Sequence, residues 1–422
     1  MPSHTSVPLD NPEARQRLQA LASDKECLKR LHQVMTACNQ AVSPEILALP
    51  WSARHQHLTV ARSISRLLKV VGEDMGKVLG LGFLNLPALL VYEAELLAGK
   101  DEGHAVKMYD AWKAPLLCAM MEHFRAEEWR DNNGVVYELT GPLMDLMMQT
   151  EIDPDVPIRL VQPPYPMISL KPEPGRSFKD LGLKLLADFP VEEIVISRLA
   201  DDDDPDRESL GIQLLAPAIK PNGTPQGGMA LFSEIFLPIK KGEETPISQR
   251  LLERLADGQL GGGEDEQPED WIEFIAFLLK ILLYIGVSSA RLCPRPEHTE
   301  IMAEADREKN QKRRDKLVAK ASRSYDRIVV GPQFLPEENN TGTATGHREM
   351  PTHWRRGFFK RQRHGEGRSL VKHVFISPVL VRADRLTNAE APPAPKDYRV
   401  QSITRQPGTL PNSTVPATIA HR

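Results

Sequence analysis

The chain has 422 residues, of which 41% are hydrophobic and 26% are charged, so it can bury a sizeable core and is not wholly disordered. Its 53 Lys and Arg and 57 Asp and Glu give a formal net charge of −4, which excludes a generally basic nucleic-acid coat. Four cysteines without a C-x-x-C pair exclude a disulfide scaffold and a thiolate zinc finger, and they suit a reducing cytosol.

The charge is unevenly distributed along the chain. Residues 303–385 carry 19 basic and 10 acidic side chains, a local charge of +9. Residues 386–422 carry 4 basic and 2 acidic side chains, which leaves −15 for residues 1–302. The sequence therefore predicts an acidic body followed by a basic region.

Apolar spacing predicts a helical region over residues 1–152. Leu18, Leu21, Leu28, Leu31 and Val34 form one apolar stripe at helical spacing. Further helices are expected over 52–71, 91–97 and 105–128, followed by a turn at 132–134 and another short helix. The first residues lack the charged and apolar regions of a secretory signal, so we expect a soluble cytosolic protein.

Residues 153–300 are expected to form an α+β body with a central mixed sheet. Four β-rich runs predict strands over 167–170, 193–199, 209–216 and 229–236. The apolar run 270–292 predicts a long helix. Because Glu273 and Lys280 lie inside it, a buried core helix fits better than a membrane span.

The remaining chain divides into three predicted parts. Residues 301–324 form a charged linker, with one exposed helix over 304–320. Residues 325–385 form a small basic β-rich module, and residues 386–422, rich in Pro, Thr, Asn and Ala, form a disordered tail. The predicted fold class is α+β.

The tract 352–382 places eight cations among four aromatic side chains and predicts a hairpin with Gly365-Glu366-Gly367 at its turn. Cations attract phosphates and aromatic rings stack on bases, so the tract is a candidate contact with RNA or a ribosome. Its candidate contact residues are His353, Trp354, Arg355, Arg356, Gly357, Phe359, Arg361, Arg363, Gly367, Arg368 and Lys372.

Two other interpretations of this tract stay open. The aromatic residues can form a small core while the arginines pair with the acidic body, or the tract can contact an acidic protein surface. His353, His364 and His373 have no carboxylate or thiolate at ligand spacing, so we expect no metal site and no cofactor.

The sequence contains no nucleophile elbow, zinc-protease motif, Walker lysine or dinucleotide fingerprint. The alternative to a binding protein is an RNA-directed nuclease or toxin, with His353 as base and Arg355 stabilising the phosphorane charge. Stable high-order assembly would favour a third class, a phage structural protein.

The segment His353-Trp354-Arg355-Arg356-Gly357-Phe358-Phe359 is followed by Gly365-Glu366-Gly367-Arg368 and by Phe375-Ile376-Ser377-Pro378-Val379. It resembles the C-terminal signature of the type V-A anti-CRISPR family of phages and plasmids, H-x-R-R-G-H-[aromatic]. Weaker correspondences cover 164–170 and 271–292. The family's second histidine is Phe358 here, so a role that needs both histidines does not carry over.

The resemblance implies a host-interaction factor that a mobile element encodes, that acts in the cytoplasm of the bacterial host cell, and that has no established catalytic site. Such a factor recognises the nascent N-terminal polypeptide of the type V-A CRISPR effector nuclease and brings about loss of its mRNA. The implied partners are this protein target and RNA or a ribosome, with no membrane and no sequence-specific DNA binding.

Overall fold

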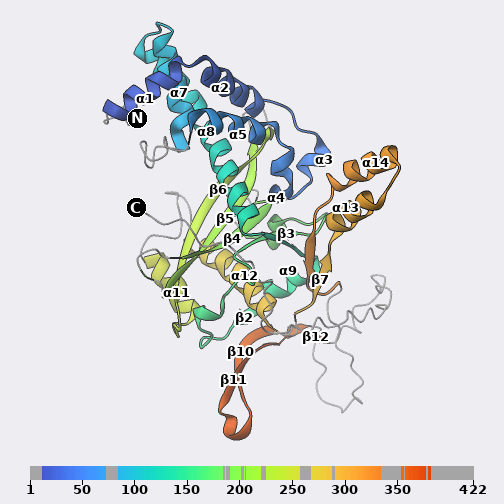
Figure 1. Ribbon diagram of the computed structural model, residues 1–422. Coiled ribbons are helices and arrows are strands. Elements are labelled where there is room, and N and C mark those ends of the chain that lie inside the picture. The colour runs from blue at the N-terminus through green and yellow to red at the C-terminus, as the bar shows by residue number, and fades with distance from the viewer. Residues whose placement is uncertain are drawn as a thin grey trace. The chain divides into compact units, whose positions relative to one another are not determined.

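The computed structural model describes residues 12–72, 84–183, 186, 191–200, 204, 206–219, 225–256, 268–287, 290–333, 353–355, 357–376 and 379–381 (Figure 1). The predicted tail, residues 386–422, lies outside the described residues.

The N-terminal region is helical, as predicted. Its described elements are α1 (Pro12–Ser23), α2 (Lys25–Cys38), α3 (Pro44–Leu47), α4 (Trp51–Arg54), η1 (His55–His57), α5 (Thr59–Val71), α7 (Leu86–Leu97) and α8 (Glu102–Asp131). The apolar stripe is divided between α1 and α2, because the Asp24 side chain accepts a hydrogen bond from Cys27 N–H at 2.8 Å and caps α2. Leu18, Leu31 and Val34 are buried against α5, α7 and α8.

A seven-stranded mixed sheet forms the centre of the body, in the order β6-β5-β4-β3-β1-β8-β7. The four predicted strands are present and longer than expected: β3 (Met167–Pro172), β4 (Glu193–Ala200), β5 (Arg207–Ile219) and β6 (Pro225–Lys240). The outer strands are β7 (Leu292–Arg295) and β8 (Arg327–Val330).

The central strand of this sheet was not predicted. The sequence suggested only a turn and a short helix after residue 131, but β1 (Val135–Leu139) lies there, followed by α9 (Gly141–Met148) and β2 (Thr150–Ile152). β1 pairs in parallel with both β3 and β8, whereas the other neighbouring strands of the sheet are antiparallel. The carboxyl ends of β1 and β3 therefore lie side by side.

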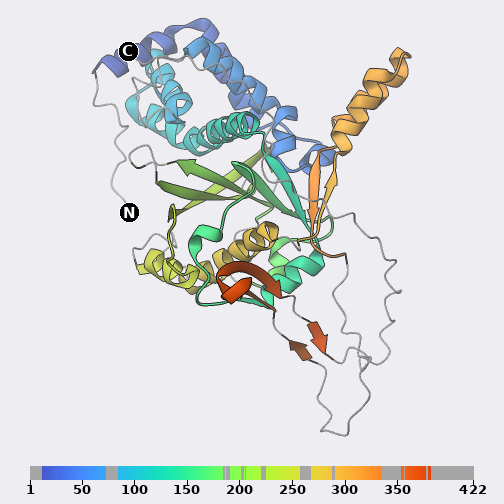
Figure 2. The same cartoon turned by 60° about the horizontal axis from the view of Figure 1, so that its bottom comes forward.

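Helices cover both faces of the sheet (Figure 2). On one face, α12 (Pro268–Gly286) packs with α9 and α11 (Ile247–Ala256) against Tyr137, Ile168 and Ile194. On the other face, Trp51 of α4 and Trp129 of α8 pack over alternate strand residues, which include Val136, Met167 and Val195. The alternation along each strand thus builds two apolar layers.

The predicted core helix is confirmed as α12, which ends at Gly286 and not at residue 292. Among the described residues, no helix is long and apolar enough to span a membrane. Lys280 is accommodated inside the apolar helix because its Nζ donates a hydrogen bond to the Met147 carbonyl oxygen at 2.8 Å. Burial lowers the pKa of Lys280 from 10.5 to about 8.

This pKa shift predicts a pH dependence of stability. Between about pH 8 and 10.5 the unfolded chain binds more protons at Lys280 than the folded chain does, so the free energy of unfolding rises with pH in this window. Lys280→Met is expected to remove that rise and to raise the free energy of unfolding at pH 7 by about 1–3 kcal/mol. Urea unfolding of both proteins at pH 7 and 9.5 measures this, and an equal pH dependence in both would contradict it.

The charged linker is not one helix. It forms α13 (Glu297–Arg307) and α14 (Gln311–Ala321), which are joined by a short break in which Asn310 caps α14 by accepting Arg313 N–H at 3.1 Å. A single helix over 304–320 was therefore a wrong prediction, since Asn310 supplies an N-cap inside it. The two helices connect the paired strands β7 and β8.

Candidate functional site

The predicted hairpin is present at the C-terminal end of the described chain. β10 (Gly357–His364) and β11 (Leu370–Ile376) pair in antiparallel, with η5 (Glu366–Arg368) at the tip. Gly365 and Gly367 take φ values of +80° and +63°, a conformation that glycine adopts without a Cβ penalty. β10 also pairs in parallel with β2, which attaches the base of the hairpin to the body.

The base of the hairpin is anchored by aromatic packing. Phe359 is only 3% exposed, and its ring centroid lies 4.9 Å from that of Phe375. Phe375 in turn meets Tyr284 of α12 edge-on at 5.3 Å. Gly357 is buried beside them. The Phe359 ring therefore belongs to the core, as the first open interpretation expected, and does not face a base.

The cations of the hairpin fall into two groups. Arg361 NH1 lies 3.3 Å from Glu244 Oε2, and Arg159 binds the other oxygen of the same carboxylate. Four further cations have no ion-pair partner among the described residues, and Gly367 lies between them at the exposed tip. These unpaired hairpin cations are Lys360, Arg363, Arg368 and Lys372, of which Lys360 lies next to the base and over the Phe358 ring.

The first half of the predicted tract is described only by its backbone. His353, Trp354 and Arg355 form strand β9 (His353–Arg355), which pairs in antiparallel with β12 (Val379–Val381). Arg356 lies outside the described residues. Among the residues that the structure does describe, no three His, Cys, Asp or Glu side chains are grouped to hold a metal ion.

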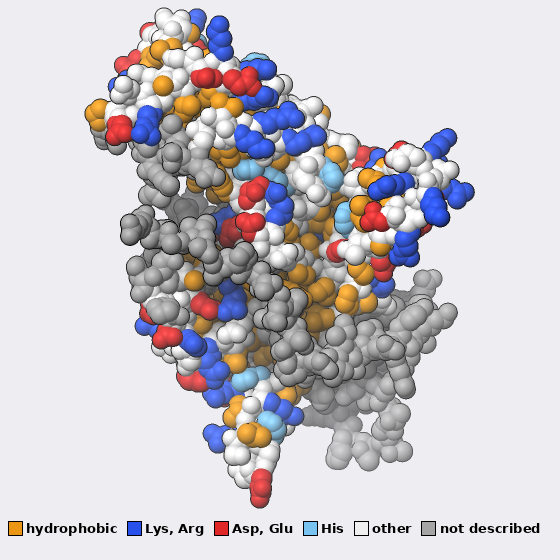
Figure 3. Space-filling model, viewed as in Figure 1, with side chains coloured by type: hydrophobic (Ala, Val, Ile, Leu, Met, Phe, Trp, Pro, Cys, Tyr) orange, Lys and Arg blue, Asp and Glu red, His pale blue; other side chains and the backbone are white. Residues whose placement is uncertain are grey.

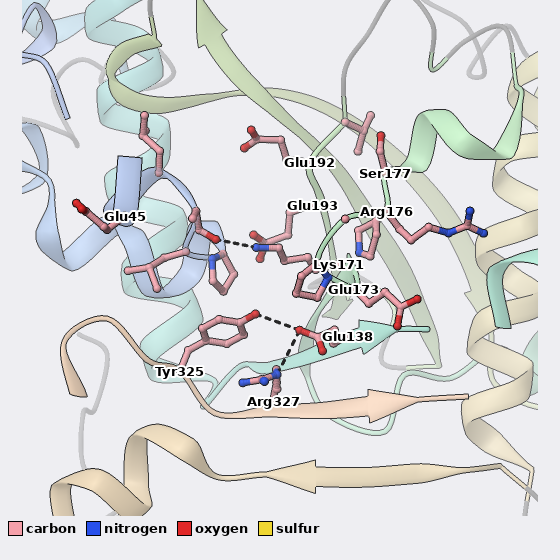
Figure 4. A pocket seen from close by; sticks show the side chains of 18 of the residues that line it. Glu45, Glu138, Lys171, Glu173, Arg176, Ser177, Glu192, Glu193, Tyr325 and Arg327 are labelled. Atoms are coloured by element: carbon pink, nitrogen blue, oxygen red, sulfur yellow. Dashed lines mark hydrogen bonds and ion pairs between the residues drawn. The ribbon is translucent and has the colours of Figure 1, made fainter. Parts of the chain in front are cut away.

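Sequence reasoning missed a pocket of about 660 Å³ at the carboxyl ends of β1 and β3 (Figure 4). One wall comes from α3 and the loop before α4, another from the loop 173–177 and η4 (Phe178–Leu181), and a third from α13 and the segment between α14 and β8. Its labelled lining residues are Glu45, Glu138, Lys171, Glu173, Arg176, Ser177, Glu192, Glu193, Tyr325 and Arg327.

Glu138 is the centre of one polar group on the floor of this pocket. Its Oε2 accepts a hydrogen bond from Tyr325 OH at 3.2 Å and lies 3.2 Å from Arg327 Nε. Arg327 also donates to Glu297 of α13 at 2.9 Å. Burial and the nearby Glu138 carboxylate raise the pKa of Tyr325, so its hydroxyl stays protonated and remains a donor.

A second polar group joins the sheet to the N-terminal helices. The buried Glu193 carboxylate accepts hydrogen bonds from the Ser169 hydroxyl and from Trp51 N–H, the latter at 2.5 Å. Burial raises the pKa of Glu193, although the Ser169 hydrogen bond opposes this shift. Lys171 Nζ donates to the Ala48 carbonyl oxygen at 3.1 Å, and burial lowers the Lys171 pKa. These bonds hold the α3–α4 wall against the sheet.

The pocket offers recognition groups of several kinds. Its lining holds six glutamates and five Lys or Arg side chains, together with four prolines and the aliphatic Leu47, Leu49 and Val191. No histidine or cysteine is present among these lining residues. Carboxylates, ammonium groups and apolar walls in one cavity match the mixed chemistry of a polypeptide segment better than a polyanion.

Comparison with known proteins identifies the family. The model of the AcrVA2-like family, described as anti-CRISPR type V subtype A2, matches residues 137–383, more than half of the chain. The chain belongs to this anti-CRISPR family. The resemblance seen in the tract after His353 is thereby confirmed. No curated protein matches the chain.

The matched range shows which parts of the molecule are shared with the family. It begins inside β1 and extends beyond β12, so it includes Glu138, Lys171, Arg327 and the whole β10–β11 hairpin. Helices α1 to α8 precede it, and with them the pocket wall formed by residues 45–50. The match thus covers the floor of the pocket, whereas the wall formed by residues 45–50 lies outside it.

Proposed function

We propose that this anti-CRISPR protein binds a segment of the type V-A effector polypeptide in the pocket beside Glu138 and Lys171. The nascent N-terminal segment of the effector is the intended ligand, and its capture leads to loss of the translating mRNA. In this proposal the protein acts in the bacterial cytoplasm and protects the phage or plasmid that encodes it from the effector.

The observation that carries the proposal is the composition of the pocket. Free energy of peptide binding comes from burying apolar side chains and from pairing backbone and charged groups, and the lining supplies partners for each. Arg323 and Lys179 are exposed on its rim, and Glu45 is exposed on the α3 wall, so charges of both signs face an incoming segment.

The second part of the proposal is contact with RNA or a ribosome through the hairpin. The four unpaired hairpin cations are free of acidic partners among the described residues, and such cations bind phosphates in a salt-dependent way. The proposed contact also includes His353, Trp354, Arg355 and Arg356, and for these four residues it rests only on the sequence pattern of the tract. Arg361 and Phe359 act in it as supports, because Glu244 and the aromatic core hold them.

A recoding experiment tests this function. Cells that produce this protein receive one of three effector genes: the original, one with synonymous opening codons, and one whose opening is shifted in frame to change the peptide. We expect the original and synonymous mRNAs to be lost and the frame-shifted mRNA to persist, since recognition acts on the polypeptide. Loss of the frame-shifted mRNA, or survival of the synonymous one, would contradict the proposal.

A further inference from the structure

Helices α13 and α14 form a projecting pair in which the two helices carry opposite charge. Glu297–Arg307 contains four acidic side chains and one basic side chain. Residues 309–323 contain seven basic side chains and one acidic side chain, a net charge of +6 over fifteen residues. The space-filling view shows Lys and Arg side chains gathered over this pair (Figure 3).

The cations of α14 share one face of the helix. At 100° per residue, Lys312, Arg313, Lys316 and Lys320 fall within an arc of about 100°. Lys312, Lys316 and Lys320 follow one another at intervals of four residues, or about 6 Å along the helix axis. All four side chains are exposed, and none of them forms an ion pair with an acidic side chain that the structure describes.

Two acidic side chains near this face contact residues outside it. Asp315, the acidic residue within α14, accepts a hydrogen bond from Gln311 at 2.7 Å. Asp306 of α13 lies 3.8 Å from Arg314, which points away from the cationic face. Neither carboxylate forms an ion pair with the four cations of this face.

The helix is also held in a fixed place. Ala321 of α14 is buried with Ile301 and Ala305 of α13, and Leu317 is half-buried on the same side. The imidazole of His298 lies 2.9 Å from the Ala321 carbonyl oxygen. Val318 is the one large apolar side chain of α14 that is exposed, at 43%. A single valine does not make the broad apolar face with which a helix enters a membrane surface.

We infer that the face of α14 formed by Lys312, Arg313, Lys316 and Lys320 binds the phosphate backbone of double-stranded RNA without reading its sequence. Three lysines in line over about 12 Å can face several phosphates, because the phosphates along one strand of a duplex follow one another at intervals of a few ångströms. The face has no aromatic side chain to stack on bases, so backbone charge is what it recognises.

This inference goes beyond the proposed function, because it assigns RNA contact to a surface separate from the hairpin and from the pocket. It needs no peptide ligand. Its test therefore uses an unrelated RNA duplex and the full chain, so that its failure leaves the recoding experiment unaffected.

The experiment measures the fluorescence anisotropy of a labelled RNA duplex at KCl concentrations between about 50 and 300 mM. Affinity that comes from phosphate contacts falls steeply over this range of salt concentration. The test variant is Lys312→Ala/Lys316→Ala/Lys320→Ala, in which alanine favours the exposed helix. The matched control is Lys25→Ala/Lys100→Ala/Lys107→Ala, which removes the same charge from exposed positions of the N-terminal region.

We expect the α14 variant to bind the RNA duplex at least about 10-fold more weakly than the unmodified chain. The slope of log K against log salt concentration should become less steep by about 2–3, since three phosphate contacts are lost and each contributes about 0.9 in a DNA duplex. The control should bind like the unmodified chain. If both variants lose the same affinity for RNA, the effect comes from the net charge of the protein and not from the α14 face, and the inference is overturned. Absence of RNA binding by the unmodified chain, or RNA binding by the α14 variant as tight as that of the unmodified chain, would also overturn it.

Discussion

Phe359→Ala is expected to lower the free energy of unfolding by about 3–5 kcal/mol and to release the hairpin from the body. The ring is 3% exposed and packs on Phe375, which contacts Tyr284 of the core helix. Its loss leaves a cavity between the hairpin and α12, for which substitutions of this type cost several kcal/mol. Denaturant unfolding measures the loss, and amide hydrogen exchange over 357–376 measures the release.

The neighbouring phenylalanine provides a matched control. Phe358 lies on the opposite face of β10, is partly exposed, and carries Lys360 Nζ at 5.6 Å over its ring. Phe358→Ala is expected to cost about 1 kcal/mol, mostly from the lost cation–π and surface contacts. Equal costs at the two positions, or unchanged hydrogen exchange in Phe359→Ala, would show that the hairpin is not anchored by this packing.

Ala48→Trp is expected to abolish anti-CRISPR protection while the protein stays folded. Ala48 is exposed, lines the pocket and accepts the Lys171 hydrogen bond through its backbone carbonyl oxygen, which the substitution leaves in place. An indole at this position occupies space that the proposed polypeptide segment needs, and steric exclusion of this kind weakens binding by about 10-fold or more. Survival of phage-infected or plasmid-bearing cells under effector targeting measures the protection.

The control for this variant is Ala20→Trp, on the exposed side of α1 and away from the pocket. It adds the same side chain to the surface and is expected to keep full protection. Circular dichroism spectra and melting temperatures of the two variants are compared to verify that both are folded. If folded Ala48→Trp keeps full protection, the pocket is not where the target binds.

The elements that the sequence predicted well are those with local signals. The hairpin of β10 and β11 was predicted with its turn at Gly365-Glu366-Gly367, because a glycine turn joins two short β-rich arms. The apolar helix α12 was evident from its length and composition. In both cases the information lies within about twenty consecutive residues, so no distant contact was needed.

Strand β1 could not be predicted in the same way. Val135–Leu139 is a five-residue run between two helices, and its partners β3 and β8 lie far along the chain. Pairing on both sides decides that these residues form a strand, and a short apolar run alone does not distinguish strand from helix. Without β1, the parallel pairing of β1 and β3 could not be predicted either, and the pocket lies at the carboxyl ends of these two strands.

The pocket has no local signature either. Its lining residues come from segments as distant as 45–50, 171–179 and 323–327, and each segment taken alone resembles an ordinary polar loop. Glu138 and Lys171 face the same cavity only because β1 and β3 are adjacent in the sheet. Similarly, the alternation in β10 left undecided whether Phe358 or Phe359 faces the core, since the answer depends on Tyr284 and Phe375.

The measurement that tests the central claim most directly is a calorimetric titration of the full chain with overlapping synthetic peptides that cover the opening of the type V-A effector. We predict that one peptide binds, that Ala48→Trp weakens its binding by about 10-fold or more, and that Ala20→Trp leaves it unchanged. If no peptide binds, or if Ala48→Trp binds as tightly as the unmodified chain, the pocket is not a polypeptide site.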